Sequence, residues 1–241
     1  MDFQMHGKTY LVTAASRGLG RAVADAIRRE GGEVLTTSRK SGESFMLDTS
    51  SEASRRQFLR AIEGQRLDGV FFNTGGPKGG DVLELSNADW RDAFEQILVG
   101  PIELIRELTP QMEPDGAVLM NASSSIAQPI AHLALSNVLR AGLYALVKTL
   151  VDELAPHRIR VNLIVPGRID TDRVRDLDRA TAGRRGVADA EVRRMAQEKI
   201  PLQRYGDPEE FGRLAAFLLS PQAAYLNGAA YWVDGGQNRG L

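Results

Sequence analysis

Short apolar runs and longer amphipathic stretches alternate along the whole chain. Apolar runs of strand length lie at residues 8–13, 33–38, 45–48, 69–73, 117–120, 159–165 and 231–233. Helical patterns lie at residues 18–30, 51–63, 88–108, 133–155 and 208–219. Strands that alternate with helices predict a parallel sheet covered by helices on both faces. We therefore expect an α/β fold with a doubly wound sheet of about seven strands.

The first strand ends in small residues, and Gly18-Leu19-Gly20 then opens the first helix. A helix that starts at a glycine turn presents free N–H groups and the positive end of its dipole, which together bind a pyrophosphate. The absent side chains of Gly18 and Gly20 allow the phosphate to approach closely. A glycine-bearing turn without a ligand is the alternative for such a short pattern.

Composition narrows the class of protein. The chain has 241 residues, 43% of them hydrophobic and 25% charged, which suits one domain over residues 1–241. A net charge of −1 predicts no attraction to nucleic acid or to an anionic membrane. The absence of cysteine excludes disulfides and thiolate chemistry, and no metal site is predicted. We find no signal-like N-terminus and expect no segment long enough to span a bilayer, so a cytoplasmic protein is predicted.

The residues after the second strand bear on the choice of cofactor. In a dinucleotide fold, an acidic residue here binds the ribose 2′-hydroxyl of NAD. This chain has Ser38-Arg39-Lys40 instead, and Arg17 lies in the glycine turn. Guanidinium groups bind a 2′-phosphate that a carboxylate would repel, so we predict NADP(H) rather than NAD(H). In the alternative, Arg39 is a solvated loop charge.

At this point the chain resembles the short-chain dehydrogenase/reductase family along nearly its whole length. The matching motifs are Thr13–Gly20, Asp48, Asn73–Gly76, Pro166-Gly167 with Thr171, and Asn227–Gly236. The resemblance implies a Rossmann-type sheet, hydride transfer, a small-molecule substrate and a homodimer or homotetramer. Ala14 replaces the first glycine of the turn, which we expect to be a mild change. Combined with the cofactor argument above, it assigns cofactor binding to Thr13, Ala15, Ser16, Arg17, Gly18, Leu19, Gly20, Ser38, Arg39, Asp48, Asn73, Gly75, Arg140, Pro166, Gly167, Ile169 and Thr171.

The catalytic positions depart from the family's pattern of Ser, Tyr, Lys and Asn. Ser123 keeps the serine position, seven residues after Gly116 and thirteen before the expected tyrosine. The tyrosine position is Ser136, the lysine position is Arg140, and the asparagine position is Ile97. We therefore name Ser123, Ser136 and Arg140 as the candidate catalytic residues.

Tyr144 and Lys148 have the family's Tyr-x-x-x-Lys spacing but lie eight residues too late in the sequence. Eight residues correspond to about 12 Å along a helix. In the family the lysine lies 22 residues before the asparagine of the next strand, and counting back from Asn162 gives Arg140. We interpret the later pair as a coincidence, with Tyr144 packed along the helix and Lys148 solvated.

Two functions follow from these departures. The first is an NADP(H)-dependent oxidoreductase that prefers an acceptor whose reduced anion is already stable, such as a quinone or a conjugated carbonyl, with Ser123 and Arg140 at the anion. His132 is a weaker candidate acid. The second is a catalytically impaired NADP(H)-binding sensor or partner subunit. The retained nicotinamide-end motif favours the first, and the lost tyrosine, lysine and asparagine favour the second.

Residues 170–200 are predicted to form a substrate lid rich in arginine. These arginines could bind an anionic substrate or carrier, but interleaved acids favour a solvated helical lid; they are Arg173, Arg175, Arg179, Arg184, Arg185, Arg193 and Arg194. The helix predicted at 133–155 is apolar on more than one face, which predicts a subunit interface.

Overall fold

The computed structural model describes residues 2–40 and 42–240, and its centre is one parallel sheet. The sheet has seven strands in the order β3-β2-β1-β4-β5-β6-β7. All pairings are parallel, and the register runs through Leu11↔Leu35, Leu11↔Val70 and Leu119↔Asn162. The strands are β1 (Thr9–Val12), β2 (Glu33–Ser38), β3 (Phe45–Met46), β4 (Leu67–Phe72), β5 (Met112–Asn121), β6 (Arg160–Pro166) and β7 (Ala230–Val233).

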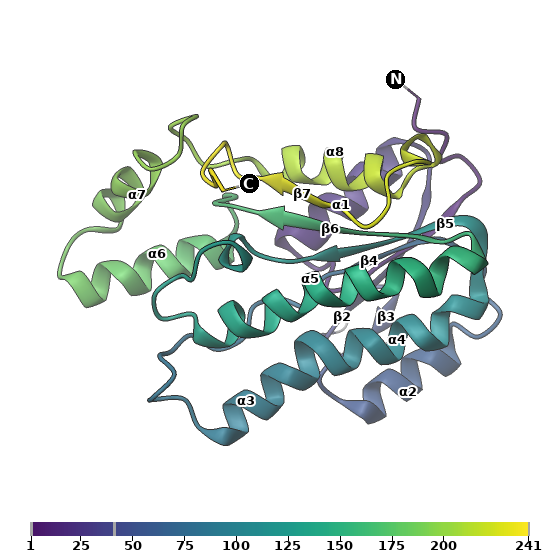
Figure 1. Ribbon diagram of the computed structural model, residues 1–241, viewed down its shortest axis with the longest axis horizontal. Coiled ribbons are helices and arrows are strands. Elements are labelled where there is room, and N and C mark those ends of the chain that lie inside the picture. The colour runs from purple at the N-terminus through teal and green to yellow at the C-terminus, as the bar shows by residue number, and fades with distance from the viewer. Residues whose placement is uncertain (1, 41, 241) are drawn as a thin grey trace.

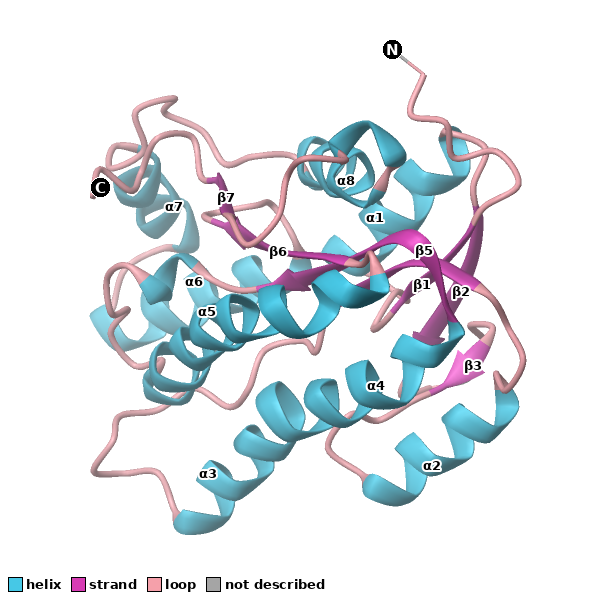
Figure 2. Cartoon of the chain, turned by 45° about the vertical axis from the view of Figure 1, so that its right-hand side comes forward, coloured by secondary structure: helices cyan, strands magenta, loops and turns pink. Residues whose placement is uncertain are grey.

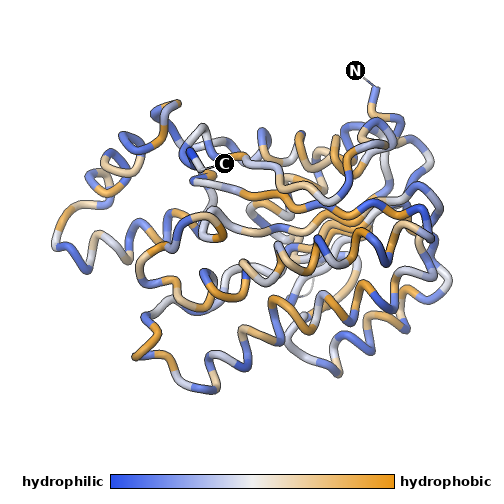
Figure 3. The backbone as a smooth tube through the Cα atoms, viewed as in Figure 1, coloured by the Kyte–Doolittle hydropathy of each residue, from blue (hydrophilic) through white to orange (hydrophobic). Residues whose placement is uncertain are grey.

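Helices cover both faces of this sheet (Figure 1; Figure 2). On one face α1 (Gly18–Arg29) packs against α8 (Pro208–Leu219), and on the other lie α2 (Glu52–Ala61), α3 (Asn87–Phe94), α4 (Gly100–Leu108) and α5 (Ala134–Leu154). Each face has its own apolar core, and in Figure 3 the hydrophobic colour concentrates on the strands between the helical layers. Two further helices, α6 (Asp172–Arg185) and α7 (Asp189–Gln197), extend beyond the carboxyl ends of the strands.

The predicted fold class, a parallel sheet of about seven strands with helices on both faces, is confirmed. Strand β2 and helix α8 have the predicted bounds, and most other elements differ at their ends by one to three residues. The largest difference is β5, which starts at Met112 rather than at residue 117, because Met112 pairs with Leu67 before a shift in register.

The helix predicted over 88–108 is interrupted. A π-helical turn, Glu95–Val99, separates α3 from α4. Pro101 lies just beyond it and cannot donate to the carbonyl four residues earlier, which disfavours a regular α-helix at this point. The turn buries Ile97 completely and brings Gly100 close to the chain after β3. A Cβ on Gly100 would lie 2.2 Å from the carbonyl oxygen of Thr49.

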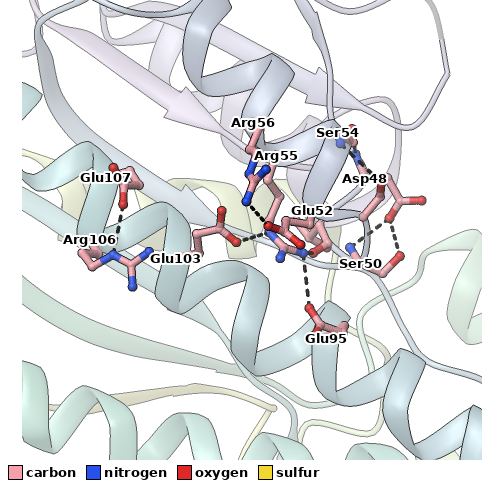
Figure 4. Close-up of polar contacts among 12 residues, drawn as sticks. Asp48, Ser50, Glu52, Ser54, Arg55, Arg56, Glu95, Glu103, Arg106 and Glu107 are labelled. Carbon is pink, nitrogen blue, oxygen red and sulfur yellow. Dashed lines mark hydrogen bonds and ion pairs between the residues drawn. The ribbon is translucent and has the colours of Figure 1, made fainter.

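A buried arginine fixes this interrupted helix to α2 (Figure 4). Arg55 is only 3% exposed, and its Nε lies 2.6 Å from Glu103 Oε2 while Nη1 lies 3.4 Å from Glu95 Oε2. Nη1 also donates to the carbonyl oxygen of Thr49 at 2.7 Å. Because these contacts join α2, the π-helical turn and α4, the turn is held firmly against the edge where the β3 segment ends.

Helix α5 corrects one expectation. The segment Ala134–His157, 24 residues, is long and apolar enough to cross a membrane by length and composition alone. Its leucines pack into the core against the sheet, including Leu135, Leu139 and Leu143. The helix is therefore a core element of this fold, although no segment of such length and hydropathy was expected.

Candidate functional site

The candidate site lies at the carboxyl ends of β1, β4, β5 and β6. The chain runs outward from β1 to β3 and then returns on the other side of β1 with β4, so the strand order reverses between β1 and β4. Ligands of open α/β sheets bind in the crevice at such a reversal. The glycine turn follows β1, and the Asn73–Gly76 segment follows β4, so both predicted cofactor segments border this crevice.

The glycine turn forms a tight cradle. Gly18 has φ +57°, and a Cβ on Gly20 would lie 2.3 Å from the carbonyl oxygen of Ala14. Ala14 itself has φ +49°, in the left-handed region that favours glycine. The replacement of glycine by Ala14 therefore carries backbone strain of about 1–2 kcal/mol, which corrects the expectation of a mild change.

The first helix leaves its N-terminal amides free. Its N-cap, Arg17, makes no side-chain hydrogen bond to the first turn. By contrast, α2, α3 and α6 are capped by the hydroxyls of Ser51, Ser86 and Thr171. Free amides at Leu19 and Gly20 fit a phosphate, which is the ligand that such a helix start binds. Ser16 is exposed on the same turn, and Ala15 is buried, with its N–H donating to the carbonyl oxygen of Thr37.

The basic residues predicted to bind a 2′-phosphate lie at the end of β2 and in the glycine turn. Arg39 is exposed and makes no ion pair within the described residues, and Arg17 is 75% exposed, 3.9 Å from Asp172. Ser38 is buried and accepts a hydrogen bond from the Lys40 N–H at 3.0 Å. Asp48 is half-buried and accepts hydrogen bonds from the N–H and hydroxyl of Ser50.

Asparagine side chains link the strand ends across the crevice. Asn121 Nδ2 donates to Asn73 Oδ1 at 3.0 Å, and Asn73 Nδ2 lies 3.4 Å from the carbonyl oxygen of Ala14. The Thr13 hydroxyl bonds to the backbone of Asn73, so Thr13 joins β1 to β4. Asn121 Oδ1, the Thr74 hydroxyl and the Ser125 hydroxyl are buried without a partner among the described residues. Buried polar atoms are normally satisfied, so these three groups fit a polar ligand or water.

Arg140 lies at the centre of the same edge and is 5% exposed. Its Nη1 donates to the carbonyl oxygens of Asn121 and Ala122 at 2.7 and 3.2 Å, and its Nη2 donates to that of Gly75 at 2.6 Å. Burial and the nearby charge of Arg173 lower the pKa of Arg140 to about 10, so it still carries a full charge at neutral pH. The guanidinium binds backbone carbonyls that border the crevice, and Nε and one N–H of Nη2 remain for a ligand.

The two candidate serines flank Arg140. Ser136 lies one turn before it on the same face of α5 and is buried. Ser123 follows Ala122, whose carbonyl Arg140 binds, and the Ser123 oxygen accepts the N–H of Ser125 at 3.2 Å. Its hydroxyl proton is thus free to donate to a ligand.

The segment after β6 closes the site from the other side. Gly167 packs so tightly on Asp234 that a Cβ would lie 2.6 Å from the aspartate Cβ. Ile169 is buried, and Thr171 caps α6 with its methyl group 3.7 Å from the Cβ position of Gly18. Pro166 is the last residue of β6 and is half-buried at this edge. A cavity of about 500 Å³ opens next to this contact, lined by α1, α8 and the start of α6.

Tyr144 and Lys148 lie away from this edge. Tyr144 is 44% exposed, and Lys148 donates at 2.5 Å to the carbonyl oxygen of Gly228, which precedes β7 at the opposite end of the sheet. Lys148 was expected to be solvated, and the structure corrects this because its ammonium group is bound to the loop before β7. His132 forms an exposed contact with Asp81, Nδ1 to Oδ2 at 2.8 Å, which joins two loops at the mouth of the site.

Two residues at the site escaped the sequence analysis as site residues. Gln96, in the π-helical turn beside Ile97, donates to the carbonyl oxygen of Thr74 at 2.5 Å. Arg173 donates to the carbonyl oxygen of Pro77 at 2.9 Å. The sequence offered one signal for Arg173, namely its position two residues after Thr171. It offered none for Gln96, because the contact of Gln96 with Thr74 depends on the interruption of the helix.

The segment predicted to form a lid contains α6 and α7, and most of its arginines are paired with acids. Arg175 and Arg193 both contact Asp170, Arg179 contacts Asp176, and Arg194 contacts Glu191. These pairs support the interpretation of a solvated helical lid for most of the arginine-rich stretch.

Comparison with known proteins agrees with this geometry. The family described as "Enoyl-(Acyl carrier protein) reductase" matches residues 13–238. The chain belongs to the short-chain dehydrogenase/reductase family. It is 27% identical to the 3-oxoacyl-[acyl-carrier-protein] reductase FabG of Aquifex aeolicus, over 98% of this chain and 99% of that protein. It is 31% identical to human mitochondrial dehydrogenase/reductase SDR family member 2, over 95% of this chain and 86% of that protein. L-Sorbose reductase from Gluconobacter frateurii, solved with NADPH and L-sorbose, superposes with a TM-score of 0.92 at 26% identity, with both chains fully covered.

The residues of this short-chain dehydrogenase/reductase fit a dinucleotide. The Gly20 cradle and the uncapped start of α1 fit a pyrophosphate, and the three unpartnered polar groups at Asn121, Thr74 and Ser125 fit the polar remainder of such a cofactor. The chain is thus an oxidoreductase by its family membership.

Proposed function

We propose that the protein is an NADP(H)-dependent oxidoreductase with an atypical site, which transfers hydride to or from a conjugated carbonyl or a quinone-like compound. The observation that carries the proposal is the placement of Arg140, a buried group that is charged at neutral pH and is fixed beside Ser123 at the carboxyl edge. A fixed cation there stabilises an anion but, because it stays protonated, does not transfer a proton readily.

The cofactor proposal rests on the glycine turn and on the basic residues near it. The free amides of Leu19 and Gly20 hold the pyrophosphate, and Arg39 with Arg17 holds a 2′-phosphate. NADPH in the solved L-sorbose reductase, and the printed description of the similar protein YwfH as an NADPH-dependent reductase, support this choice. Asn73, Gly75, Pro166 and Thr171 then border the rest of the cofactor.

The chemistry that the side chains supply is orientation and charge stabilisation. When bound, the nicotinamide supplies or accepts the hydride. Ser123 donates a hydrogen bond to the substrate oxygen and keeps its proton, and Arg140 stabilises the negative charge that develops there. An enolate or a quinol anion is stable enough to take its proton from water, whereas the alkoxide from a simple ketone needs an acid within the site. Ser136 is a weak acid, and loss of general acid catalysis costs ~10²–10⁴-fold.

The test is NADPH consumption with a simple ketone, a conjugated enone and a quinone of similar size. For each compound we divide the rate of wild type by the rate of a FabG-type enzyme that keeps the tyrosine. We expect this ratio to be at least ~100-fold higher for the enone or the quinone than for the ketone. The variant Ser136→Tyr/Arg140→Lys restores an acid and should gain ketone reduction. A wild type that prefers the simple ketone would contradict the proposal.

The alternative is a catalytically impaired NADP(H)-binding sensor or partner subunit. It is favoured by the three carbonyl contacts of Arg140, which are the contacts of a structural residue. Tight NADPH binding without consumption of any acceptor, together with a gain of activity in the double variant, would select this alternative.

We also propose a single domain over residues 1–241, a homodimer or homotetramer and a cytoplasmic location. The assembly proposal rests on partly exposed apolar side chains along α3 to α5: Phe94, Ile102, Val138 and Tyr144. A cavity of about 390 Å³ lined by Ile105, Leu146 and Leu150 lies between α4 and α5 on this face. Light scattering at micromolar concentration tests it, and a monomeric mass would contradict it.

A further inference from the structure

Arg173 reaches from the lid to the segment that follows β4. It lies in the first turn of α6, just after Thr171, and its Nη2 donates to the carbonyl oxygen of Pro77 at 2.9 Å. A Cβ on Gly76 would lie 2.7 to 2.9 Å from the guanidinium atoms, so the glycine is what allows this approach. The guanidinium therefore lies flat against the backbone, with most of its N–H groups uncommitted.

Arg140, on α5, binds the same short segment after β4. Its contact with Gly75 and the contact of Arg173 with Pro77 are only two residues apart. The two positive charges are close enough that Arg173 lowers the pKa of Arg140. Within residues 2–40 and 42–240, no carboxylate lies within 4.0 Å of either guanidinium. Two neighbouring cations without an acid are costly unless an anion joins them.

Other arginines near the site differ in this respect. Arg168 pairs with Asp178, Arg175 with Asp170 and Asp172, and Arg193 with Asp170. Acids therefore pair with the other arginines of this group, whereas Asp176 acts on Arg173 only from a distance and makes its ion pair with Arg179. Among the described residues Arg184 and Arg185 also lack a carboxylate within 4.0 Å, but both are exposed at the C-terminal end of α6. Arg173 is the one of these three whose guanidinium contacts the segment after β4.

We propose that Arg173 binds a carboxylate of the substrate, so that the preferred substrate is a carbonyl compound that also carries a carboxylate. Arg173 is exposed and reachable, whereas the buried Arg140 behind it supplies long-range attraction. A planar guanidinium can bind a carboxylate with two parallel hydrogen bonds. This inference rests on the proposed oxidoreductase function and adds the substrate class.

Cofactor phosphates are the competing anions for Arg173. In the proposed placement the pyrophosphate lies on the turn at Gly18–Gly20, and the 2′-phosphate lies near Arg39. Arg173 contacts the segment after β4 instead. The two sources can be separated, because loss of a phosphate contact weakens NADPH binding and loss of a substrate contact does not.

The experiment compares binding of 4-phenyl-2-oxobut-3-enoate and of its methyl ester to the protein saturated with NADP⁺, so that no hydride is available. In wild type we expect the acid to bind roughly 10–100-fold more tightly than the ester, the range for hydrogen bonds to a charged group. Arg173→Met should remove that preference and leave ester binding within about twofold, while Arg173→Lys should restore part of it. Arg184→Met, an exposed arginine on the same helix, is the matched control and should bind as wild type does.

Three results would overturn the carboxylate site. They are equal binding of acid and ester in wild type, an equal loss for both in Arg173→Met, and a weaker affinity of Arg173→Met for NADPH itself. The last result would make Arg173 a ligand of the cofactor. Failure of the proposed oxidoreductase function is a different result, the absence of NADPH binding. In that case, titration of the acid and of its methyl ester into the protein without nucleotide still tests the carboxylate site.

Discussion

Two buried arginines occupy opposite ends of the sheet, and their surroundings differ. Arg140 binds three carbonyl oxygens at the carboxyl ends of β4 and β5. Arg160, at the start of β6, binds the carbonyl oxygens of Leu218, Ser220 and Leu226. Each is less than a tenth exposed. Both guanidiniums therefore make the same number of hydrogen bonds to backbone carbonyls.

The difference is in charge. Leu218 and Ser220 are at the C-terminal end of α8, where the helix dipole is negative, so Arg160 lies in a favourable field. Burial lowers the pKa of Arg160, but Tyr231, Tyr10 and Asp115 act in the opposite direction. Arg140 has no such compensation, since the nearby charge that acts on it is Arg173. At the end with Arg160, the protein itself compensates the positive charge. At the end with Arg140, the positive charge is left for a ligand to compensate.

The largest effect on stability is expected from Arg160→Met. The change takes the Arg160 donor from three carbonyl oxygens, of which Leu226 keeps Asn162 Nδ2 and Ser220 keeps the Ala223 N–H. It also removes a cation from the C-terminal end of α8, so the free energy of unfolding should fall by about 2 kcal/mol. Affinity for NADPH should stay within twofold, because the cofactor edge is untouched. Urea unfolding and NADPH titration measure the two quantities, and a variant that unfolds normally but loses NADPH would refute the structural assignment of Arg160.

Arg140→Met should show the opposite pattern. Removing this cation also removes its repulsion with Arg173, so the free energy of unfolding should fall by only about 1 kcal/mol. NADPH-dependent turnover should fall by ~10²-fold, since a fixed charge at the developing anion is lost. Arg140→Lys is the control that keeps the charge. If Arg140→Met destabilises the protein as much as Arg160→Met while turnover per folded molecule is unchanged, the contrast between the two arginines is wrong.

Much of the fold and part of the site could be predicted from the sequence, and the limits have physical causes. The Gly18–Gly20 turn and the bounds of β2 depend on local residues, so they were predictable. The partners of Arg140 were not, because Gly75 is 65 residues away in the chain and only the packed sheet brings it close. The π-helical turn depends on Pro101 together with the contacts of Arg55, and the positive φ of Ala14 has no signal in its residue type. Catalytic roles for Ser123, Ser136 and Arg140 stay predictions.

Tyr10→Phe gives the smallest expected effect and probes the end of the sheet near Arg160. Tyr10 is fully buried in β1, and its hydroxyl has no partner among the described residues. Replacing an unsatisfied hydroxyl by hydrogen should therefore raise the free energy of unfolding by up to about 1 kcal/mol at pH 7.

The pH dependence of the same variant sharpens the test. Burial raises the pKa of Tyr10 above its ordinary value of 10.0, and nearby Asp68 acts in the same direction. Above pH 10 the unfolded chain therefore releases this proton while the native protein retains it, so the native state loses stability as the pH rises. In urea unfolding, the free energy of unfolding of wild type should fall relative to that of Tyr10→Phe between pH 8 and pH 10.5. The control is Tyr225→Phe, at a fully exposed tyrosine, which should unfold as wild type does at pH 7. A difference between wild type and Tyr10→Phe that stays constant over this range would show that Arg160, rather than burial, controls the ionisation of Tyr10.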